Sequence, residues 1–253
     1  MSEFAGRFVW RELMTTTPNK ATGFYGELFG WKNKTENMGD MGDYVMLING
    51  EAPVGGIGTA PEGVPSHWMT YVTVDDIDAS VAKAKALGGT LKHGPFAVPG
   101  VGRMAFVEDP AGAVIAPFQA ETPGASGDEQ PALHSFCWSQ LMTTDRSVES
   151  FYEGLFGWKA APMPNGMTVF SRGDQMTASV LDLPEAAVKM GAPSHWLDYV
   201  LVEDVTASLA KANQLGATTL VDVTEVPNMG IFAILADPTG ATVALWKHTG
   251  DHA

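Results

Sequence analysis

The side chains that could carry chemistry in this chain are few and widely spaced. The 253 residues include six histidines and a single cysteine, Cys137. No nucleophile elbow, phosphate-binding loop or Ser-His-Asp order is visible. Cys137 stands beside Trp138 without a basic neighbour, so we do not expect a reactive thiolate. The histidines are His67, His93, His134, His195, His248 and His252.

Glu12 and His67 are the leading candidates for acid/base or metal chemistry. Alternation along a strand puts His67 on the same face as Met69 and Tyr71. Glu12 shares a face with Trp10 in the same way. A metal held by His67 and Glu12 would need a third ligand, since two ligands are too few for a tight zinc site.

Three motifs occur twice, which indicates tandem copies of one domain. The segment 24–31, Phe-Tyr-Gly-Glu-Leu-Phe-Gly-Trp, returns 127 residues later as 151–158. Pro-Ser-His-Trp at 65–68 and Asp-Pro-Ala-Gly at 109–112 return 128 residues later, the latter as Asp-Pro-Thr-Gly. A feature present in both copies serves the fold, whereas a polar residue in only one copy is a candidate for function. This criterion favours a structural role for His67 and His195, anchored between a proline and a tryptophan.

Two charged residues occur in one copy alone. Glu12 and Arg103 are replaced in copy 2 by Gln140 and Ile231, so the fold does not need the charges. Either the two form a mutual ion pair, or they orient a polar group of a ligand. The sequence leaves both alternatives open.

These residues must be positioned by strands and helices that follow the same order in every half-copy. In copy 1, a strand at 8–13 precedes a helix that opens at Thr17-Pro18-Asn19 and ends near Phe29, before Gly30. Apolar runs at 44–48 and 54–57 flank Asn49-Gly50, which favours a hairpin turn.

The second half of copy 1 repeats that order. It predicts a strand at 68–74, a helix capped by Asp75-Asp76 and ending near Leu87, and strands at 104–107 and 113–118. The helix spacing of apolar residues, repeated in copy 2, puts one face of each helix on a sheet. The chain is therefore expected to be an α+β protein of four βαβββ units. We place the domains at residues 1–120 and 132–253, joined by a linker at 121–131 rich in Gly, Ser, Pro and acids.

A single unit of this kind buries little, because one helix covers only one face of its sheet. Pairing units so that curved mixed sheets enclose a cleft solves this problem and creates a pocket. The architecture thus predicts concave sites before any residue is considered.

Composition limits the partners. The formal net charge of −14, without a basic cluster, argues against nucleic acid and anionic membranes. No run approaches the roughly 20 apolar residues that span a bilayer, and the N-terminus lacks the pattern of a signal peptide. A lone cysteine fits a reducing compartment. We expect a cytoplasmic monomer or homodimer whose partner is a small molecule.

The motifs and their order resemble the vicinal oxygen chelate superfamily, which contains glyoxalase I, the bleomycin-resistance proteins and the extradiol dioxygenases. The residues that carry the resemblance are Phe24-Tyr25 to Gly30-Trp31, Val74-Asp75-Asp76 and Asp109-Pro110-Ala111-Gly112, with matching versions in copy 2. The resemblance covers nearly the whole chain and implies two tandem glyoxalase-like domains.

Catalytic members of that superfamily hold a divalent metal, and the resemblance shows where its ligands would stand. The first-strand position falls on Trp10 and Trp138, the fifth-strand position on Met69 and Leu197, and the eighth-strand Glu on Ala116 and Ala244. None of these is an oxygen or imidazole donor. We therefore expect no metal and no other cofactor.

The aromatic residues near those positions predict the character of the pocket. Trp10, Tyr71 and Phe118 would line a cleft suited to planar or apolar ligands, although plain core packing is the alternative. The expected ligand contacts are Trp10, Glu12, His67, Met69, Tyr71, Arg103, Phe118, Trp138, His195, Tyr199 and Trp246, and the candidate catalytic residues among them are Glu12, His67 and Arg103.

Our leading functional hypothesis is metal-independent binding or sequestration of a small, partly aromatic or apolar molecule. The alternative is a glyoxalase-like lyase or hydroxylase-type enzyme with a rearranged active site, favoured by Glu12 together with His67. An inert interaction module is less favoured, because the implied fold gives the chain two clefts. The sequence does not identify the ligand.

Overall fold

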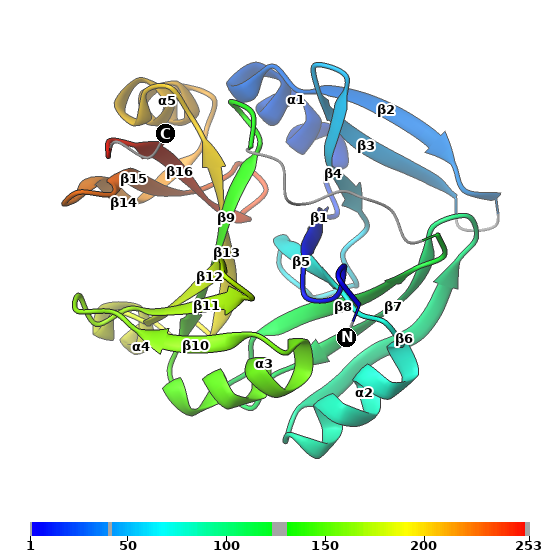
Figure 1. Ribbon diagram of the computed structural model, residues 1–253. Helices are drawn as coiled ribbons and strands as arrows, with labels where there is room; N and C mark the ends of the chain where they lie inside the picture. Colours follow the sequence, from blue (N-terminus) through cyan, green and yellow to red (C-terminus); the bar gives the residue numbers. More distant parts are fainter. Residues whose placement is uncertain (1, 40–41, 123–130, 251–253) are drawn as a thin grey trace. The chain divides into compact units, whose positions relative to one another are not determined.

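The computed structural model describes residues 2–39, 42–122 and 131–250, and its first copy contains two βαβββ units (Figure 1). The first unit comprises β1 (Phe8–Met14), α1 (Pro18–Phe29), β2 (Lys32–Asn37), β3 (Asp43–Asn49) and β4 (Ala52–Gly58). The second comprises β5 (His67–Thr73), α2 (Ile77–Ala86), β6 (Thr90–Val98), β7 (Gly102–Glu108) and β8 (Val114–Ala120).

The second copy repeats the order with small additions. Its first unit comprises β9 (Phe136–Thr143), the 3-10 turn η2 (Arg146–Val148), α3 (Glu149–Phe156), β10 (Lys159–Pro162), β11 (Thr168–Arg172) and β12 (Gln175–Asp182). A short helix α4 (Glu185–Lys189) leads to β13 (His195–Leu201), α5 (Val205–Gln214), β14 (Thr218–Val226), β15 (Gly230–Ala236) and β16 (Thr242–His248). Four βαβββ units in two tandem halves, an α+β fold, are therefore confirmed.

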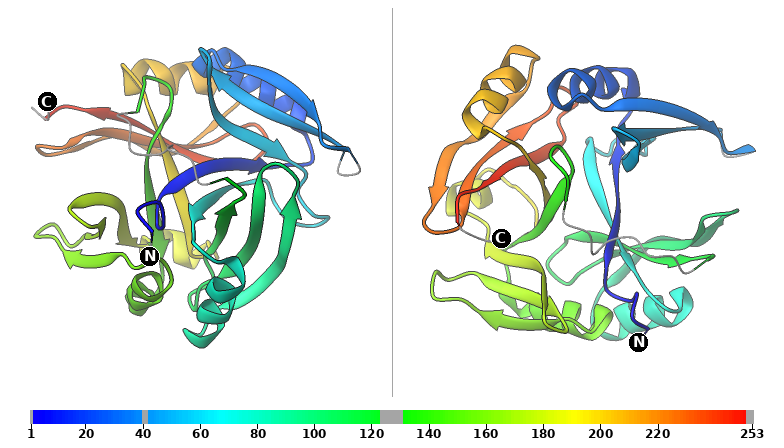
Figure 2. Two further views of the ribbon diagram at one scale, coloured as in Figure 1. Left: turned by 45° about the vertical axis from the view of Figure 1, so that its right-hand side comes forward. Right: turned by 45° about the horizontal axis from the view of Figure 1, so that its top comes forward.

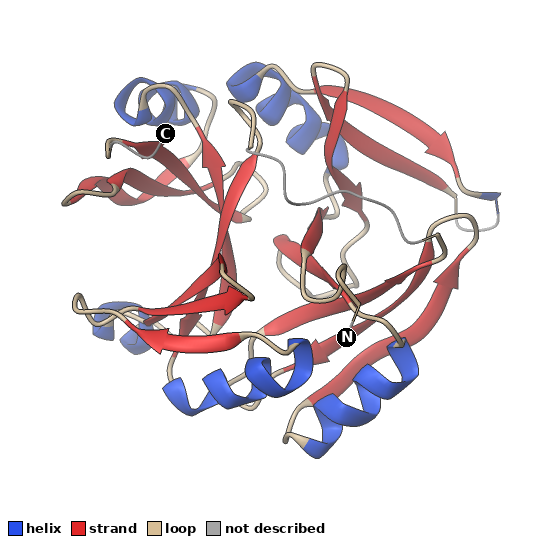
Figure 3. Cartoon of the chain, in the orientation of Figure 1, coloured by secondary structure: helices blue, strands red, loops and turns tan. Residues whose placement is uncertain are grey.

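The strands form two mixed eight-stranded sheets, neither of which closes into a barrel. The hydrogen-bonded order is β2-β3-β4-β1-β5-β8-β7-β6 in one and β10-β11-β12-β9-β13-β16-β15-β14 in the other. β1 runs parallel to β4 and β5 parallel to β8, while the pairs next to them in sequence are antiparallel. Figure 3 shows helix α2 lying along β6 and β7, which it contacts.

Two strands of copy 1 had no counterpart in the sequence prediction. β2 reads Lys-Asn-Lys-Thr-Glu-Asn and is almost wholly exposed at the edge of its sheet, so it carries no apolar alternation. β6 is the opposite edge strand and is interrupted by register shifts around Gly94 and Pro95. Of the expected linker at 121–131, residues 123–130 lie outside the described residues.

Helix α1 shows why the predicted elements form. Pro18 stands at its first turn, where the missing N–H costs nothing. Its buried face consists of Ala21, Phe24, Tyr25, Leu28 and Phe29. Gly30 ends it in the left-handed conformation, at φ 75°, and its N–H donates to the Gly26 carbonyl. No helix among the described residues is long and apolar enough to span a bilayer.

The chain forms two compact units, and each combines parts of both copies. Unit 1 contains residues 1–9, 69–129 and 139–196, and unit 2 contains residues 10–68, 130–138 and 197–253. Within unit 2, α1 of copy 1 contacts α5 of copy 2, and within unit 1, α2 contacts α3 (Figure 2). Each helix therefore completes its apolar core with a helix from the other copy.

The three repeated motifs meet inside these cores. In unit 2 the Tyr25 hydroxyl donates to Asp237 Oδ2 at 2.8 Å, and the Trp68 indole donates to the Tyr25 hydroxyl at 3.0 Å. In unit 1, Tyr152 donates to Asp109 at 2.8 Å, and Trp196 donates to Tyr152 at 3.0 Å. Because each network joins the tyrosine of one copy to the aspartate of the other, the motifs hold the fold together.

Candidate functional site

Trp10, Tyr44 and Glu12 form one hydrogen-bonded group in unit 2, which we call the Trp10 triad. The indole Nε1 of Trp10 donates to the Tyr44 hydroxyl at 2.9 Å. That hydroxyl also hydrogen bonds to Glu12, and because a carboxylate only accepts, Tyr44 donates. Burial, followed by the negative charge of Glu12, raises the pKa of Tyr44 far above its usual value of 10.0. Tyr44 thus stays protonated and holds the carboxylate in place.

Two glycines on β4 make room for the Trp10 triad. Glu12 on β1 pairs in register with Gly56 on β4. A Cβ at Gly56 would lie only 1.8 Å from the Tyr44 hydroxyl oxygen, so the tyrosine crosses the strand where no side chain stands. A Cβ at Gly58 would lie 3.1 Å from a Glu12 carboxylate oxygen.

Copy 2 builds the equivalent place differently. Gln140 stands for Glu12, and its Nε2 donates to Ser179 Oγ at 3.0 Å. Ser179 pairs in register with Gln140, so it occupies the position of Gly56. The same register puts Met167 where copy 1 has Tyr44. The fold is therefore compatible with an uncharged group here, and the carboxylate with its tyrosine is specific to copy 1.

The sequence predicted Trp10 and Glu12 as site residues but missed Tyr44. Tyr44 comes from β3, and only the order β3-β4-β1 brings it across to β1. A signal was present, since Gly55, Gly56 and Gly58 crowd a single strand, which indicates a close approach by another group.

The residues at the metal-ligand positions do not fit a divalent metal. Trp10 offers only an N–H donor, and that group is already bonded to Tyr44. Met69 and Ala116 are buried and supply no oxygen or imidazole. Within residues 2–39, 42–122 and 131–250, no group of three or more His, Cys, Asp or Glu side chains could hold a metal ion. No step of the chemistry proposed below uses a metal.

The two motif histidines are anchored at strand entrances. His67 Nδ1 lies 2.8 Å from the Pro65 carbonyl, and His195 Nδ1 lies 2.9 Å from the Pro193 carbonyl. Because a carbonyl only accepts, Nδ1 carries the proton in both. The identical geometry in both copies supports the structural interpretation of these residues.

Arg103 pairs with Asp78 on helix α2, at 2.6 Å, on the exposed surface of unit 1. The hydrogen bond from Arg103 lowers the pKa of the Asp78 carboxyl below its usual value. On β7 and β8, Arg103 pairs with Gln119 and its neighbour Met104 pairs with Phe118. Since successive side chains point to opposite faces, Arg103 and Phe118 lie on different faces of the sheet. The alternative in which Arg103 pairs with Glu12 gains no support.

The remaining aromatic candidates fall into two environments. Tyr71 is buried, with its ring centroid 6.3 Å from that of Phe106, and Tyr199 is buried 6.2 Å from Trp246. Phe118, Trp138 and Trp246 are half-buried. Cys137 donates to the Tyr199 carbonyl, and burial raises the pKa of the Cys137 thiol to about 12. A thiol with that pKa is not a nucleophile at neutral pH, as the sequence predicted.

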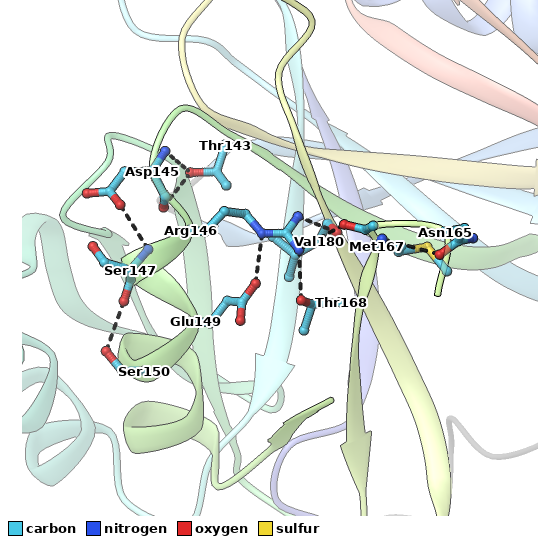
Figure 4. Close-up of polar contacts among 11 residues, drawn as sticks. Thr143, Asp145, Arg146, Ser147, Glu149, Ser150, Asn165, Met167, Thr168 and Val180 are labelled. Atoms are coloured by element: carbon cyan, nitrogen blue, oxygen red, sulfur yellow. Dashed lines mark hydrogen bonds and ion pairs between the residues drawn. The ribbon is translucent and has the colours of Figure 1, made fainter. Parts of the chain in front are cut away.

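A second polar cluster, around Arg146 in unit 1, has a structural explanation (Figure 4). The Arg146 guanidinium donates to the Val180 carbonyl at 2.8 Å and to Thr168 Oγ1 at 2.7 Å, and it forms an ion pair with Glu149 at 2.9 Å. Asp145 caps the turn by accepting from the Ser147 N–H at 2.8 Å. These contacts tie the start of α3 to β11 and β12, which is work for the fold.

Comparison with known proteins places these observations in a family context. The model of the Glyoxalase/Bleomycin resistance protein/Dioxygenase superfamily matches residues 7–116. A protein of Mycobacterium tuberculosis named "Putative glyoxylase CFP32" is 34% identical, over 94% of this chain and 93% of its own length. The anthracycline biosynthesis protein DnrV of Streptomyces peucetius is 28% identical, over 95% of this chain and 93% of its own length.

Solved structures show the same fold at low sequence identity. A Mn(II)-bound glyoxalase from Novosphingobium aromaticivorans is 15% identical, with a TM-score of 0.64 over 96% of this chain and 82% of that chain. The 2,3-dioxygenase LapB from Pseudomonas sp. KL28 is also 15% identical, with a TM-score of 0.64 over 99% of this chain and 96% of that chain. At this identity the likeness concerns the fold alone.

Proposed function

Because the chain belongs to the glyoxalase/bleomycin resistance protein/dioxygenase superfamily, we propose that it binds a small, planar, partly aromatic molecule without a metal. The Trp10 triad is the proposed centre of that site. It stands in copy 1 at the first-strand position where catalytic members of the superfamily hold a metal ligand.

One observation carries the proposal: the Trp10 triad puts an indole ring beside a fixed carboxylate acceptor. An indole offers a flat surface on which an aromatic ring stacks. Glu12 accepts a hydrogen bond from Tyr44, and a carboxylate has room for about four such bonds. A ligand would stack on Trp10 and donate a hydroxyl or amine hydrogen to Glu12.

The chemistry of Tyr44 favours binding over tyrosine-based catalysis. Its raised pKa keeps the hydroxyl protonated at neutral pH, so Tyr44 serves neither as a base nor as a nucleophile there. The relatives named for anthracycline biosynthesis support an aromatic ligand, since anthracyclines are polycyclic aromatic molecules.

The second candidate function is a glyoxalase-like lyase or a hydroxylase-type enzyme with a rearranged site. Two observations favour it: the relative named as a glyoxylase, and the half-buried Glu12 carboxylate, which could act as a general base. Met69, Tyr71 and Phe118, with Trp138, His195, Tyr199 and Trp246 of copy 2, remain proposed contacts for either function.

The binding proposal is tested by titrating 1,4-dihydroxyanthraquinone into the protein and following tryptophan fluorescence and heat. We expect Trp10→Ala to weaken binding by about 1–3 kcal/mol, the cost of one lost aromatic contact. Trp138→Ala is the matched control, because Trp138 is the copy 2 counterpart without a carboxylate beside it. A large fall in melting temperature with unchanged affinity would show that Trp10 is core instead.

The enzyme alternative needs a separate experiment. Turnover of a 2-oxoaldehyde–thiol adduct would be followed with protein treated with a chelator. Turnover that survives chelation and is lost in Glu12→Gln would favour the lyase. No turnover, together with tight binding of the quinone, would favour sequestration.

A further inference from the structure

Four ring-bearing side chains gather on unit 1 away from the residues discussed above: Tyr71, His93, Phe96 and Phe106, which we call the His93 face. The imidazole of His93 lies 5.1 Å from the Phe96 ring and 6.1 Å from the Phe106 ring, centroid to centroid. Phe106 meets Phe96 edge-on at 5.9 Å and Tyr71 edge-on at 6.3 Å. Such tilted and edge-on contacts leave ring faces and edges for a further ring.

A bulge in β6 brings the four rings to one side of the sheet. Residues 93 and 96 would point to opposite faces of a regular strand. The register between β6 and β7 shifts between them, so that His93 pairs with Phe106 and Phe96 with Met104. Gly94 permits the shift: its φ is 89°, and a Cβ there would lie 2.9 Å from the Met104 carbonyl oxygen.

Copy 2 contains the same bulge without the rings. In β14 and β15, the register shifts leave Val221 paired with Ile234 and Thr224 paired with Phe232. Val221, Thr224 and Ile234 therefore stand where copy 1 has His93, Phe96 and Phe106. The fold needs the bulge but does not need an imidazole or a pair of phenyl rings on it.

The His93 face is not the core of unit 1. The alternate residues of β7, Ala105 and Val107, point to the other side and are fully buried in the core that includes α2. On the His93 face, Phe96 and Phe106 are only half-buried and His93 is exposed. Within the described ranges, His93 makes ring contacts and no hydrogen bond. Its nitrogens are thus available to a ligand.

We propose that the His93 face binds a second flat aromatic group and that the imidazole of His93 hydrogen bonds to a hydroxyl on that group. A neutral imidazole offers one donor and one acceptor, which matches a phenolic hydroxyl. The net charge of −14 disfavours a carboxylated ligand in the same place. The inference stands on residues separate from the Trp10 triad and does not require that the triad bind anything.

The test uses two probes that differ by one group, naphthalene and 2-naphthol, titrated into the full-length protein. We expect Phe106→Ala to weaken binding of both probes by roughly tenfold, the usual loss for one aromatic contact. The matched control is Ile234→Ala, the equivalent change in copy 2, which should leave both affinities unchanged. Phe106→Leu serves in place of Phe106→Ala if the alanine variant does not fold.

The role of His93 has its own readout. In wild type, 2-naphthol should bind more tightly than naphthalene and should shift the Cε1–H resonance of His93 in a ¹H–¹³C spectrum, assigned with His93→Ala. In that variant the preference for 2-naphthol should disappear while naphthalene still binds.

The outcomes also separate this inference from the proposed function. Loss of probe binding in Phe106→Ala but not in Trp10→Ala supports the His93 face alone. Loss in Trp10→Ala but not in Phe106→Ala overturns it and leaves the Trp10 triad standing. Absence of probe binding overturns it as well, and so does a dimer that Phe106→Ala dissociates, because the face would then be covered by a second copy of the chain.

Discussion

Single residues matter most in this protein where one copy departs from the other. Tyr44, Glu12 and Gly56 form a set in copy 1, and Met167, Gln140 and Ser179 occupy the same register positions in copy 2. The sets are mutually exclusive in space, since any side chain at position 56 meets the Tyr44 hydroxyl. A comparison within one chain thus separates residues required by the fold from residues that serve a site.

Gly56→Ser tests that set. The new Cβ would lie 1.8 Å from the Tyr44 hydroxyl oxygen, so the tyrosine must leave Trp10 and Glu12. We expect a loss of about 1–3 kcal/mol in unfolding free energy, measured by urea denaturation, from overpacking and lost hydrogen bonds. The double variant Gly56→Ser with Tyr44→Met should recover much of the loss, because it recreates the copy 2 pair. A single variant as stable as wild type would contradict the steric argument.

Asp109 gives a pH prediction. Burial raises its pKa above the ordinary 3.8, against the lowering effect of the hydrogen bonds from Tyr152 and the backbone. A raised folded-state pKa contributes stability that is fully present below the unfolded pKa and is lost as the pH rises through the folded pKa. The advantage of wild type over Asp109→Asn should therefore grow as the pH falls from 7 to about 4, in urea unfolding at several pH values. A gap that narrows on acidification would contradict the sign.

At the scale of elements, helix ends were read correctly from sequence and edge strands were not. Asp76 accepts from the Ala79 N–H at 3.0 Å, as the Asp75-Asp76 pair predicted. A capping signal is local, because one side chain bonds the backbone three residues away. An edge strand such as β2 is defined by its neighbour β3, and nothing in its own polar sequence marks it.

The cap of α5 is the element-scale prediction. Asp204 accepts from the Ala207 N–H at 2.9 Å, so Asp204→Ala removes a partner from the first turn. We expect a loss of about 1 kcal/mol in unfolding free energy, measured by urea denaturation. Glu203→Ala is the control, since Glu203 is exposed and next in sequence, and it should change stability by less than about 0.5 kcal/mol. Equal losses from both would point to a general effect of charge.

At the scale of the whole molecule, the two copies complete each other. Unit 2 also contains a buried ion pair between Arg11 of copy 1 and Asp198 of copy 2, at 3.2 Å, with side chains 12% and 0% exposed. The offset of 128 residues puts Ser139 and Thr70 at the corresponding positions of unit 1, both buried. A charged pair in one unit and a hydroxyl pair in the other distinguish the two combinations of half-copies.

Asp198→Thr tests this pair. It leaves the largely buried Arg11 without its carboxylate, and removing one partner of such a pair costs about 3–5 kcal/mol. The double variant Arg11→Ser with Asp198→Thr should recover most of that loss, because unit 1 is built with Ser139 and Thr70. The measurement is urea unfolding of the two variants and wild type. A double variant no more stable than the single one would show that the copies are not interchangeable here.

The sequence alone determined the repeat, the order of the elements, the family and the lack of metal donors at Trp10, Met69 and Ala116. These features are encoded locally, in motif identity, apolar spacing and residue type at fixed offsets. Only the tertiary structure decided which side chains meet. Tyr44 reaches Glu12 through the register of three strands, His93 and Phe96 share a face because of a bulge, and Tyr25 finds its aspartate 212 residues away. Such contacts depend on pairing between distant segments, and no local pattern in either segment specifies its partner.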